Sequence, residues 1–168
     1  MSEKSVNEAV SFGARLAGSQ AFADLFRDGM ALVEETAAYL DGPGRQESKK
    51  LERNAALAYA TESMRLTTRL MQLASWLLLH RAVKEGEMSL AQANKEKAKV
   101  KLATGENNDE HNIKLLPDRL RVLVQRSKAL QIAVRRLDAT IHAGPARIDR
   151  GNPVERQLGL LKAAFEQE

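Results

Sequence analysis

The chain has 168 residues, a formal net charge of +4 and no cysteine. Without cysteine it cannot build a disulfide framework, a thiolate zinc site or a cysteine nucleophile. Hydrophobic residues make up 43% of the sequence and aromatic residues only 4%, so Leu, Ala, Val and Met must fill the core of what we expect to be a single domain. The N-terminus lacks the apolar segment of a signal peptide, and charges interrupt the most hydrophobic stretch. We therefore expect a soluble, cytoplasmic protein that makes no membrane contact.

The first predicted helix follows a weakly patterned N-terminal arm, residues 1–18. Ser19 stands where an N-cap is expected, and apolar side chains at helical spacing predict a helix over residues 19–41. Gly29 lies within the apolar stripe, where the missing side chain would let another helix come close. The sequence Asp-Gly-Pro-Gly at residues 41–44 is a strong helix stop.

The second predicted helix, residues 48–86, is long and contains a stretch that is apolar on several sides. Its apolar side chains form three rows: Leu66, Leu70, Leu73 and Leu77; Met71, Ala74 and Leu78; and Trp76, Leu79 and Val83. A helix that is apolar on nearly all sides is surrounded by other elements, so this one is predicted to be the central helix of a bundle.

The third row, Trp76, Leu79 and Val83, permits two interpretations. Either the first helix or the segment after Ser89 covers it, or it forms a subunit or partner interface, where Trp is enriched. The second interpretation predicts a homodimer that uses part of this surface.

The third long helix is predicted over residues 116–143, with Pro117 and Asp118 in its first turn. Before it, Ser89 can cap a short helix over residues 90–103, and residues 104–112 are expected to be a polar loop. The third helix is rich in arginine, which leaves open a nucleic-acid-binding regulator as the alternative function. Because the charges of the chain are mixed, a solvated basic surface is favoured over a nucleic-acid site.

Residues 144–168 are predicted to be a flexible tail. It begins with a linker-like stretch and ends with a short amphipathic segment whose apolar face is formed by Val154, Leu158, Leu161 and Phe165. These four side chains are the candidate partner-binding residues of the tail. A segment this short gains order by docking, either onto its own bundle or onto a partner.

Sequence motifs for chemistry are missing. His80, His111 and His142 have no metal-ligand partner at helical spacing, and the glycine-rich nucleotide-binding motifs do not occur. Glu62, close to Arg65 and Arg69 in sequence, is interpreted as part of a structural ion pair. We therefore expect no enzyme, no metal and no cofactor.

The sequence LAYATESMRLTTRLMQLASWLLLHRAV, followed by EGEMSLAQANKEKAKVKL and LPDRLRVLVQRSKALQIAVRRLD, resembles the regulator of CtrA degradation family of alphaproteobacteria. The resemblance covers the second helix, the connector and the third helix. It implies a dimeric three-helix bundle that brings cargo proteins to the ClpX–ClpP protease, together with a phosphorylation-sensitive response regulator that primes the unfoldase. In that family a flexible C-terminal segment contributes to delivery.

Together these observations predict an all-α protein: an N-terminal arm (1–18), a three-helix bundle with a long central helix (19–143) and a flexible tail (144–168). The predicted function is a non-enzymatic adaptor for regulated, cell-cycle-linked proteolysis. Its expected partners are ClpX–ClpP, the priming response regulator and cargo regulators. The alternative is a basic helical transcriptional or nucleic-acid-binding regulator, and a salt series separates the two, because binding to nucleic acid weakens steeply with salt.

Overall fold

A computed structural model describes residues 19–99 and 110–142 of the chain, and this part is all-α. The helices are α2 (Gln20–Asp41), α3 (Pro43–Ser48), α4 (Arg53–Lys84), α5 (Leu90–Lys99), α6 (Glu110–Lys114) and α7 (Asp118–His142). The predicted all-α fold is therefore confirmed. The predicted arm, residues 1–18, lies outside the described residues.

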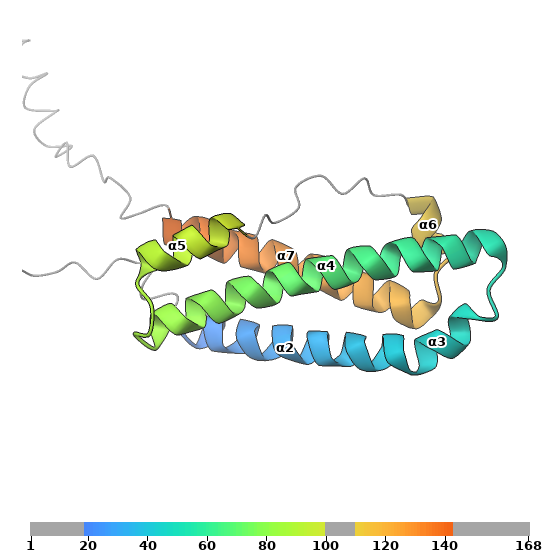
Figure 1. The fold of residues 1–168 in the computed structure, drawn as a ribbon, viewed down its shortest axis with the longest axis horizontal. Coiled ribbons are helices and arrows are strands. Elements are labelled where there is room, and N and C mark those ends of the chain that lie inside the picture. Colours follow the sequence, from blue (N-terminus) through green and yellow to red (C-terminus); the bar gives the residue numbers. More distant parts are fainter. Residues whose placement is uncertain (1–18, 100–109, 143–168) are drawn as a thin grey trace, which may run out of the picture.

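The three long helices, α2, α4 and α7, contact one another pairwise and form a three-helix bundle (Figure 1). The central row of α4 is buried between the other two helices, as predicted. The buried core consists of Leu66, Leu70, Leu73 and Leu77 of α4 with Phe22 and Leu32 of α2 and Leu120, Leu123, Val124 and Val134 of α7. Each such apolar side chain contributes roughly 1.5–3 kcal/mol by leaving water.

The bundle also contains one buried polar link between α4 and α7. The guanidinium of Arg69, which is buried, donates a hydrogen bond of 2.7 Å from Nη1 to Ser127 Oγ, and Ser127 Oγ donates to the carbonyl of Val124. A buried arginine is costly unless it is hydrogen-bonded, so this link fixes how α4 and α7 face each other.

The boundary between the first two helices differs from the prediction. The stop at residues 41–44 does end α2, but Pro43 begins α3 at once because proline is favoured in the first turn of a helix. The long helix begins at Arg53 instead of residue 48. Gly44 is needed at this corner, since a Cβ there would lie 2.7 Å from both the carbonyl oxygen of Tyr39 and the hydroxyl of Tyr59.

Gly29 has the role predicted for it. It is buried, and an added Cβ would lie 2.6 Å from Cδ1 of Leu77 and 3.5 Å from Cδ2 of Leu130. The missing side chain therefore lets α2 approach both α4 and α7 at the same level of the bundle.

Replacing Gly29 with valine is expected to lower the free energy of unfolding by about 1–3 kcal/mol, because the new Cβ would lie 2.6 Å from Cδ1 of Leu77, which is itself buried in the core. Ala37→Val, at an exposed position of the same helix, is the control for the cost of a β-branched residue. Urea denaturation of both variants checks the expectation. If the two variants had the same free energy of unfolding, the contact between α2 and α4 would have to relax at no cost, which would contradict the expectation.

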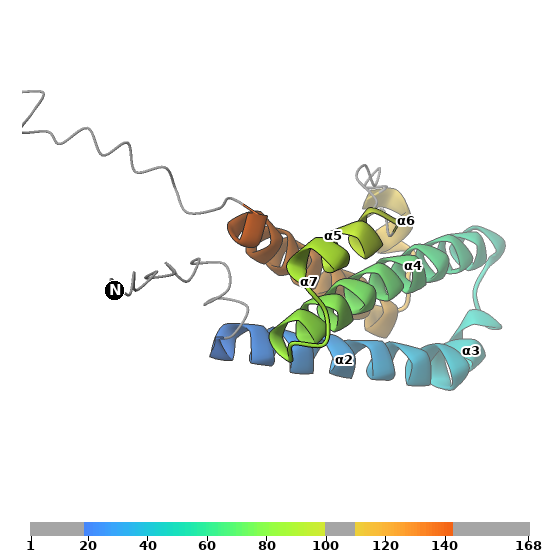
Figure 2. The same cartoon turned by 60° about the vertical axis from the view of Figure 1, so that its left-hand side comes forward.

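The segment after Ser89 forms α5, as predicted, and begins with a reciprocal cap. The backbone N–H of Gln92 donates to Ser89 Oγ at 3.1 Å, and the backbone N–H of Ser89 donates to Gln92 Oε1 at 3.1 Å. This capping box satisfies two N–H groups that a helix start otherwise leaves unpaired. Figure 2 shows α5 folded back along α4 toward α7. Ala93 of α5 is fully buried.

Ser19 is the N-cap residue of α2, as predicted, with extended backbone, although its side chain makes no capping hydrogen bond. One other prediction needs correction. Residues 104–112 were expected to be a loop, yet Glu110–Lys114 forms the short helix α6. This helix packs against α4, which supplies the tertiary contacts that local sequence does not reveal. Within residues 19–99 and 110–142, no helix is long and apolar enough to cross a bilayer.

Candidate partner-binding surfaces

Trp76 lies in the core of the protein, with 2% of its surface exposed. Its indole contacts Phe22 of α2, with ring centroids 6.3 Å apart, and stacks on His80 at 4.0 Å. The indole N–H donates a hydrogen bond of 2.8 Å to Asp138 Oδ1 of α7. Of the two interpretations of this residue, the structure supports burial beneath neighbouring helices, so Trp76 is not available on the surface for a partner.

Asp138 joins three helices at this point. It accepts the indole N–H of Trp76 from α4 and the ammonium of Lys97 from α5, with Nζ 2.6 Å from Oδ1 and 2.5 Å from Oδ2. Nearby, His142 Nε2 lies 2.7 Å from Asn94 Oδ1. Burial raises the pKa of Asp138, but the hydrogen bonds from Lys97 and Trp76 outweigh it and hold the pKa below its usual range. The carboxylate therefore stays charged and anchors α5 to the bundle.

His80 is buried beside this cluster and is held neutral. Burial lowers its pKa, although the hydrogen bond to the backbone carbonyl of Trp76 acts in the opposite direction. Nδ1 lies 3.1 Å from that carbonyl oxygen and must carry the proton to donate to it. Nε2 is buried without a hydrogen-bond partner among the described residues, so protonating it would bury an unpaired N–H.

Stability is therefore expected to decrease as the pH falls below about 6.5, the usual pKa of histidine, because the unfolded chain then binds a proton that folded His80 resists. The slope contributed by one such group is at most about 1.4 kcal/mol per pH unit. Stability is expected to fall again below about pH 4, because Asp138, whose pKa is lowered in the folded protein, then becomes protonated. Urea denaturation between pH 7.5 and 5.5 checks the first part, and His80→Gln should flatten it. An equal slope in wild type and variant would contradict the assignment to His80.

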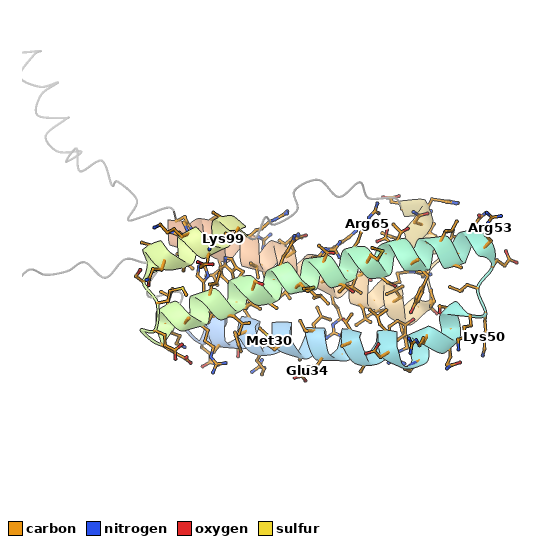
Figure 3. All side chains as sticks on the ribbon, viewed as in Figure 1. Met30, Glu34, Lys50, Arg53, Arg65 and Lys99 are labelled. Atoms are coloured by element: carbon orange, nitrogen blue, oxygen red, sulfur yellow. The ribbon has the colours of Figure 1, made fainter. Side chains whose placement is uncertain are left out.

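Leu79 and Val83, the other members of the third row, are half-buried. Leu79 lines a hollow of about 340 Å³ between α4 and α5, together with Ser75, Leu78 and Ala82 of α4 and the stems of Glu96 and Lys99 of α5. α5 therefore covers part of this row and leaves a shallow apolar hollow beside it. Figure 3 shows Lys99 at this end of the bundle.

The most exposed apolar surface lies on another side of α4. Leu57, Met64, Met71 and Leu78 are 61%, 72%, 66% and 53% exposed and recur every seven residues. We call these four side chains the heptad row. A helix surrounded on several sides was predicted, but Met71 and Leu78 lie in solvent. In the third row Trp76 is buried, and Leu79 and Val83 are half-buried.

The basic side chains of α7 are engaged with the protein itself where their contacts are described. Arg121 donates to the backbone carbonyl of Leu116 at 3.1 Å, Arg119 lies over the ring of Tyr39, and Arg126 forms an ion pair with Glu35 of α2. Glu35 and its neighbour Glu34, which points away from the bundle in Figure 3, belong to the acidic side of α2. The arginines therefore join α7 to the acidic side of α2 and to the loop before α7.

The predicted ion pair of Glu62 is confirmed. Glu62 is buried and accepts a hydrogen bond of 2.9 Å from Arg65. Among the described residues, no group of three or more His, Asp or Glu side chains lies close enough to hold a metal ion. The tail residues Val154, Leu158, Leu161 and Phe165 lie outside the described residues.

The described part of the chain is thus a three-helix bundle with an added helix, α5, and an uncharged exposed row on its longest helix. Residues 13–165 match the family described as "Protein of unknown function (DUF1465)". A comparison with curated proteins gave no match.

Among solved structures, the chain is similar to the crystal structure of RcdA from Caulobacter crescentus CB15, with 53% sequence identity and a TM-score of 0.64. The similarity covers 77% of this chain and 98% of that one. The chain belongs to the DUF1465 family, which is the family of RcdA, and the resemblance to the regulator of CtrA degradation family is confirmed.

Proposed function

We propose that the protein is a non-enzymatic adaptor that delivers cargo proteins to the ClpX–ClpP protease for regulated, cell-cycle-linked degradation. The observation that carries the proposal is the 53% identity to RcdA over 98% of that chain. At this identity the surfaces that contact partners are expected to be shared along with the fold. The three-helix bundle supports the proposal, because an adaptor needs surfaces and no catalytic group.

An adaptor of this kind acts through effective concentration. When one surface holds cargo and another holds the protease, the second contact becomes intramolecular, and the apparent affinity rises by roughly 10²- to 10⁴-fold without any new contact. The proposed partners are ClpX–ClpP, a priming response regulator and cargo regulators, in the cytoplasm, with the adaptor as a homodimer. Residues 19–143 are proposed as the folded unit, residues 1–18 as an arm and residues 144–168 as the tail that contributes to delivery.

The experiment is a reconstituted degradation assay with ClpX–ClpP, the response regulator in its active and inactive states, and candidate cargo proteins of the source organism. The expected result is faster cargo degradation that depends on both the adaptor and the active response regulator. If the adaptor captures cargo proteins but accelerates the degradation of none of them, the proposal is overturned.

The same preparation tests the nucleic-acid alternative. Binding to random duplex DNA is expected to be no tighter than the roughly 10⁻⁴ to 10⁻⁶ M typical of non-specific contacts and to weaken steeply with salt. The engagement of Arg119, Arg121 and Arg126 within the protein favours this outcome. Tighter binding at physiological salt would favour the alternative.

A further inference from the structure

A groove runs along the outside of the bundle between α2 and α7, which pack against each other. Its larger part, about 390 Å³, has an apolar lining of Leu25, Leu32 and Leu130 with Ala31, Ala129 and Ala133 beside them. Its smaller part, about 190 Å³, includes Val122 and Leu123. Arg126 lines the larger part and Glu35 the smaller, and the two form an ion pair, so the parts meet there. We call the whole the α2–α7 groove.

The lining of this groove lets another helix come close. Leu32 and Leu130 are buried, whereas Ala31 and Ala129 are exposed on its two sides. The distance between two packed helices depends on the size of the side chains at their contact, so alanine on both sides permits a close approach. Val122, which is 50% exposed, extends the apolar surface toward the N-terminal end of α7. In Figure 1 the groove lies between α2 and the part of α7 that passes behind α4.

The two helices that border the groove carry opposite charges. Within its bounds α2 has five acidic residues and one arginine, a net charge of −4, whereas α7 has six basic residues and two aspartates, a net charge of +4. The charged side chains that line the groove follow this division, with Asp28 and Glu35 on α2 and Arg119 and Arg126 on α7. The exception, Asp118 of α7, is paired with Arg121. The groove therefore has one acidic border and one basic border.

The charged side chains at these borders keep hydrogen-bonding capacity for a partner. The guanidinium of Arg126 has five N–H donors, and among the described residues it uses one of them, toward Oε2 of Glu35. Asp28 accepts hydrogen bonds from Arg27 through Oδ1 alone. The ion pair of Arg126 and Glu35 is 45% and 49% exposed, so a carboxylate can bind the arginine and an ammonium the glutamate without breaking it. Such charge-assisted hydrogen bonds are stronger than neutral ones.

These borders define the helix that fits between them. A helix that lies in the groove with its apolar side down presents one edge to α2 and the other edge to α7. A basic edge beside α2 and an acidic edge beside α7 give attraction on both sides, whereas two edges of the same charge give repulsion on one side. Reversing the direction of the helix exchanges its edges, so a given helix has one favourable direction.

The predicted amphipathic segment in the tail of this chain does not have such edges. At 100° per residue, Glu155, Lys162 and Glu166 fall on the same edge of its apolar face, so both signs of charge are mixed there. The separated charges of the groove therefore match a segment of another protein better than they match this tail.

We propose that the α2–α7 groove binds an amphipathic helix of a partner protein, with its apolar side on Leu25, Leu32 and Leu130, a basic edge along α2 and an acidic edge along α7. The inference rests on the adaptor function proposed above, because it names the kind of protein segment that the adaptor holds.

The first test measures the binding of three labelled synthetic peptides to the full chain by fluorescence anisotropy at physiological salt. Each peptide is about 18 residues long, so that it can be helical, and has the same leucine stripe. One has a lysine edge and a glutamate edge, one has two lysine edges and one has two glutamate edges. The mixed-edge peptide binds at least about tenfold more tightly than either of the others. Attraction to the net charge of +4 alone would instead favour the glutamate peptide.

The second test fills the groove. Ala31→Phe places a large side chain in it and weakens binding of the mixed-edge peptide by at least about tenfold, because the helix can no longer approach. Ala37→Phe is the matched control, since Ala37 is exposed on the same helix and does not line the groove; this variant binds as wild type does. Both positions are exposed, so both variants keep the circular dichroism and melting temperature of the wild type.

The third test changes the charge of the basic border. Arg126→Glu makes the middle of that border acidic and shifts the preference of the chain from the mixed-edge peptide toward the lysine peptide by at least about tenfold. Lys95→Glu on α5 changes the net charge by the same amount at an exposed position outside the groove, and it leaves the order of the three peptides unchanged.

The inference is overturned if the glutamate peptide binds best, or if Ala37→Phe weakens binding as much as Ala31→Phe. Tighter binding of a peptide of residues 153–168 than of the mixed-edge peptide would assign the groove to the tail of the chain instead. A change in mass on Ala31→Phe, measured by light scattering without peptide, would assign it to a second copy. These measurements contain neither protease nor cargo, so a failure of the degradation assay leaves their outcome unchanged, and the reverse also holds.

Discussion

Trp76→Ala is expected to lower the free energy of unfolding by about 3–5 kcal/mol, the usual cost of deleting a large buried aromatic side chain. The substitution leaves a cavity against Phe22 and His80 and removes the N–H that donates to Asp138. Since small domains are stable by only about 5–15 kcal/mol, this is a large part of the total. Urea denaturation followed by circular dichroism measures it.

Trp76→Phe is the matched variant, because it keeps an aromatic ring in the core and removes only the hydrogen bond and part of the volume. It is expected to lower the free energy of unfolding by about 1–3 kcal/mol, because the Asp138 carboxylate then loses one of its hydrogen-bond donors. If Trp76→Phe were as costly as Trp76→Ala, the hydrogen bond to Asp138, and not packing, would be what stabilises this end of the bundle.

The second large effect concerns delivery. Removing residues 145–168 is expected to leave the melting temperature nearly unchanged, because the predicted linker and the short apolar face of Val154, Leu158, Leu161 and Phe165 add little that could join a core. Degradation of at least some cargo is expected to fall by about tenfold or more, as when one of two linked contacts is lost.

A variant with the full tail but with Leu158→Ser and Leu161→Ser separates the apolar face from the length of the tail. The expectation is that it behaves like the deletion. A large loss of thermal stability on deletion would instead show that the tail docks on its own bundle. Unchanged degradation across several cargos would remove the delivery role.

The helical periodicities predicted the bundle well because they depend on local spacing. The breakers at residues 41–44 and the apolar stripes placed α2, α4 and α7 within a few residues of their ends. Even the close approach at Gly29 followed from its position in the stripe. These features depend on residues near one another in sequence, which is why sequence alone carried them.

Sequence alone left open whether the third row, Trp76, Leu79 and Val83, was covered or exposed, and the reason is physical. Spacing shows that α4 is apolar on three sides, but not which side a neighbour covers. That depends on residues far away in sequence: Asp138, which accepts the indole N–H of Trp76, and Lys97 of α5, which binds the same carboxylate. The repeat of uncharged positions from Leu57 to Leu78 was the available signal for the exposed face.

The attachment of α5 has a consequence for the order in which parts of the molecule open. Only Ala93 of this ten-residue helix is buried, and its polar attachments are the contacts of Asn94 and Lys97 with α7. Local opening needs little free energy where few apolar contacts break, whereas the amides of a bundle core open only with the whole domain. Native-state hydrogen exchange should therefore show α5 as a separate, fast-exchanging unit. Each time α5 lifts, Asp138, which accepts the indole N–H of Trp76, loses its ion pair with Lys97, so Trp76 fluorescence provides a built-in reporter of that motion.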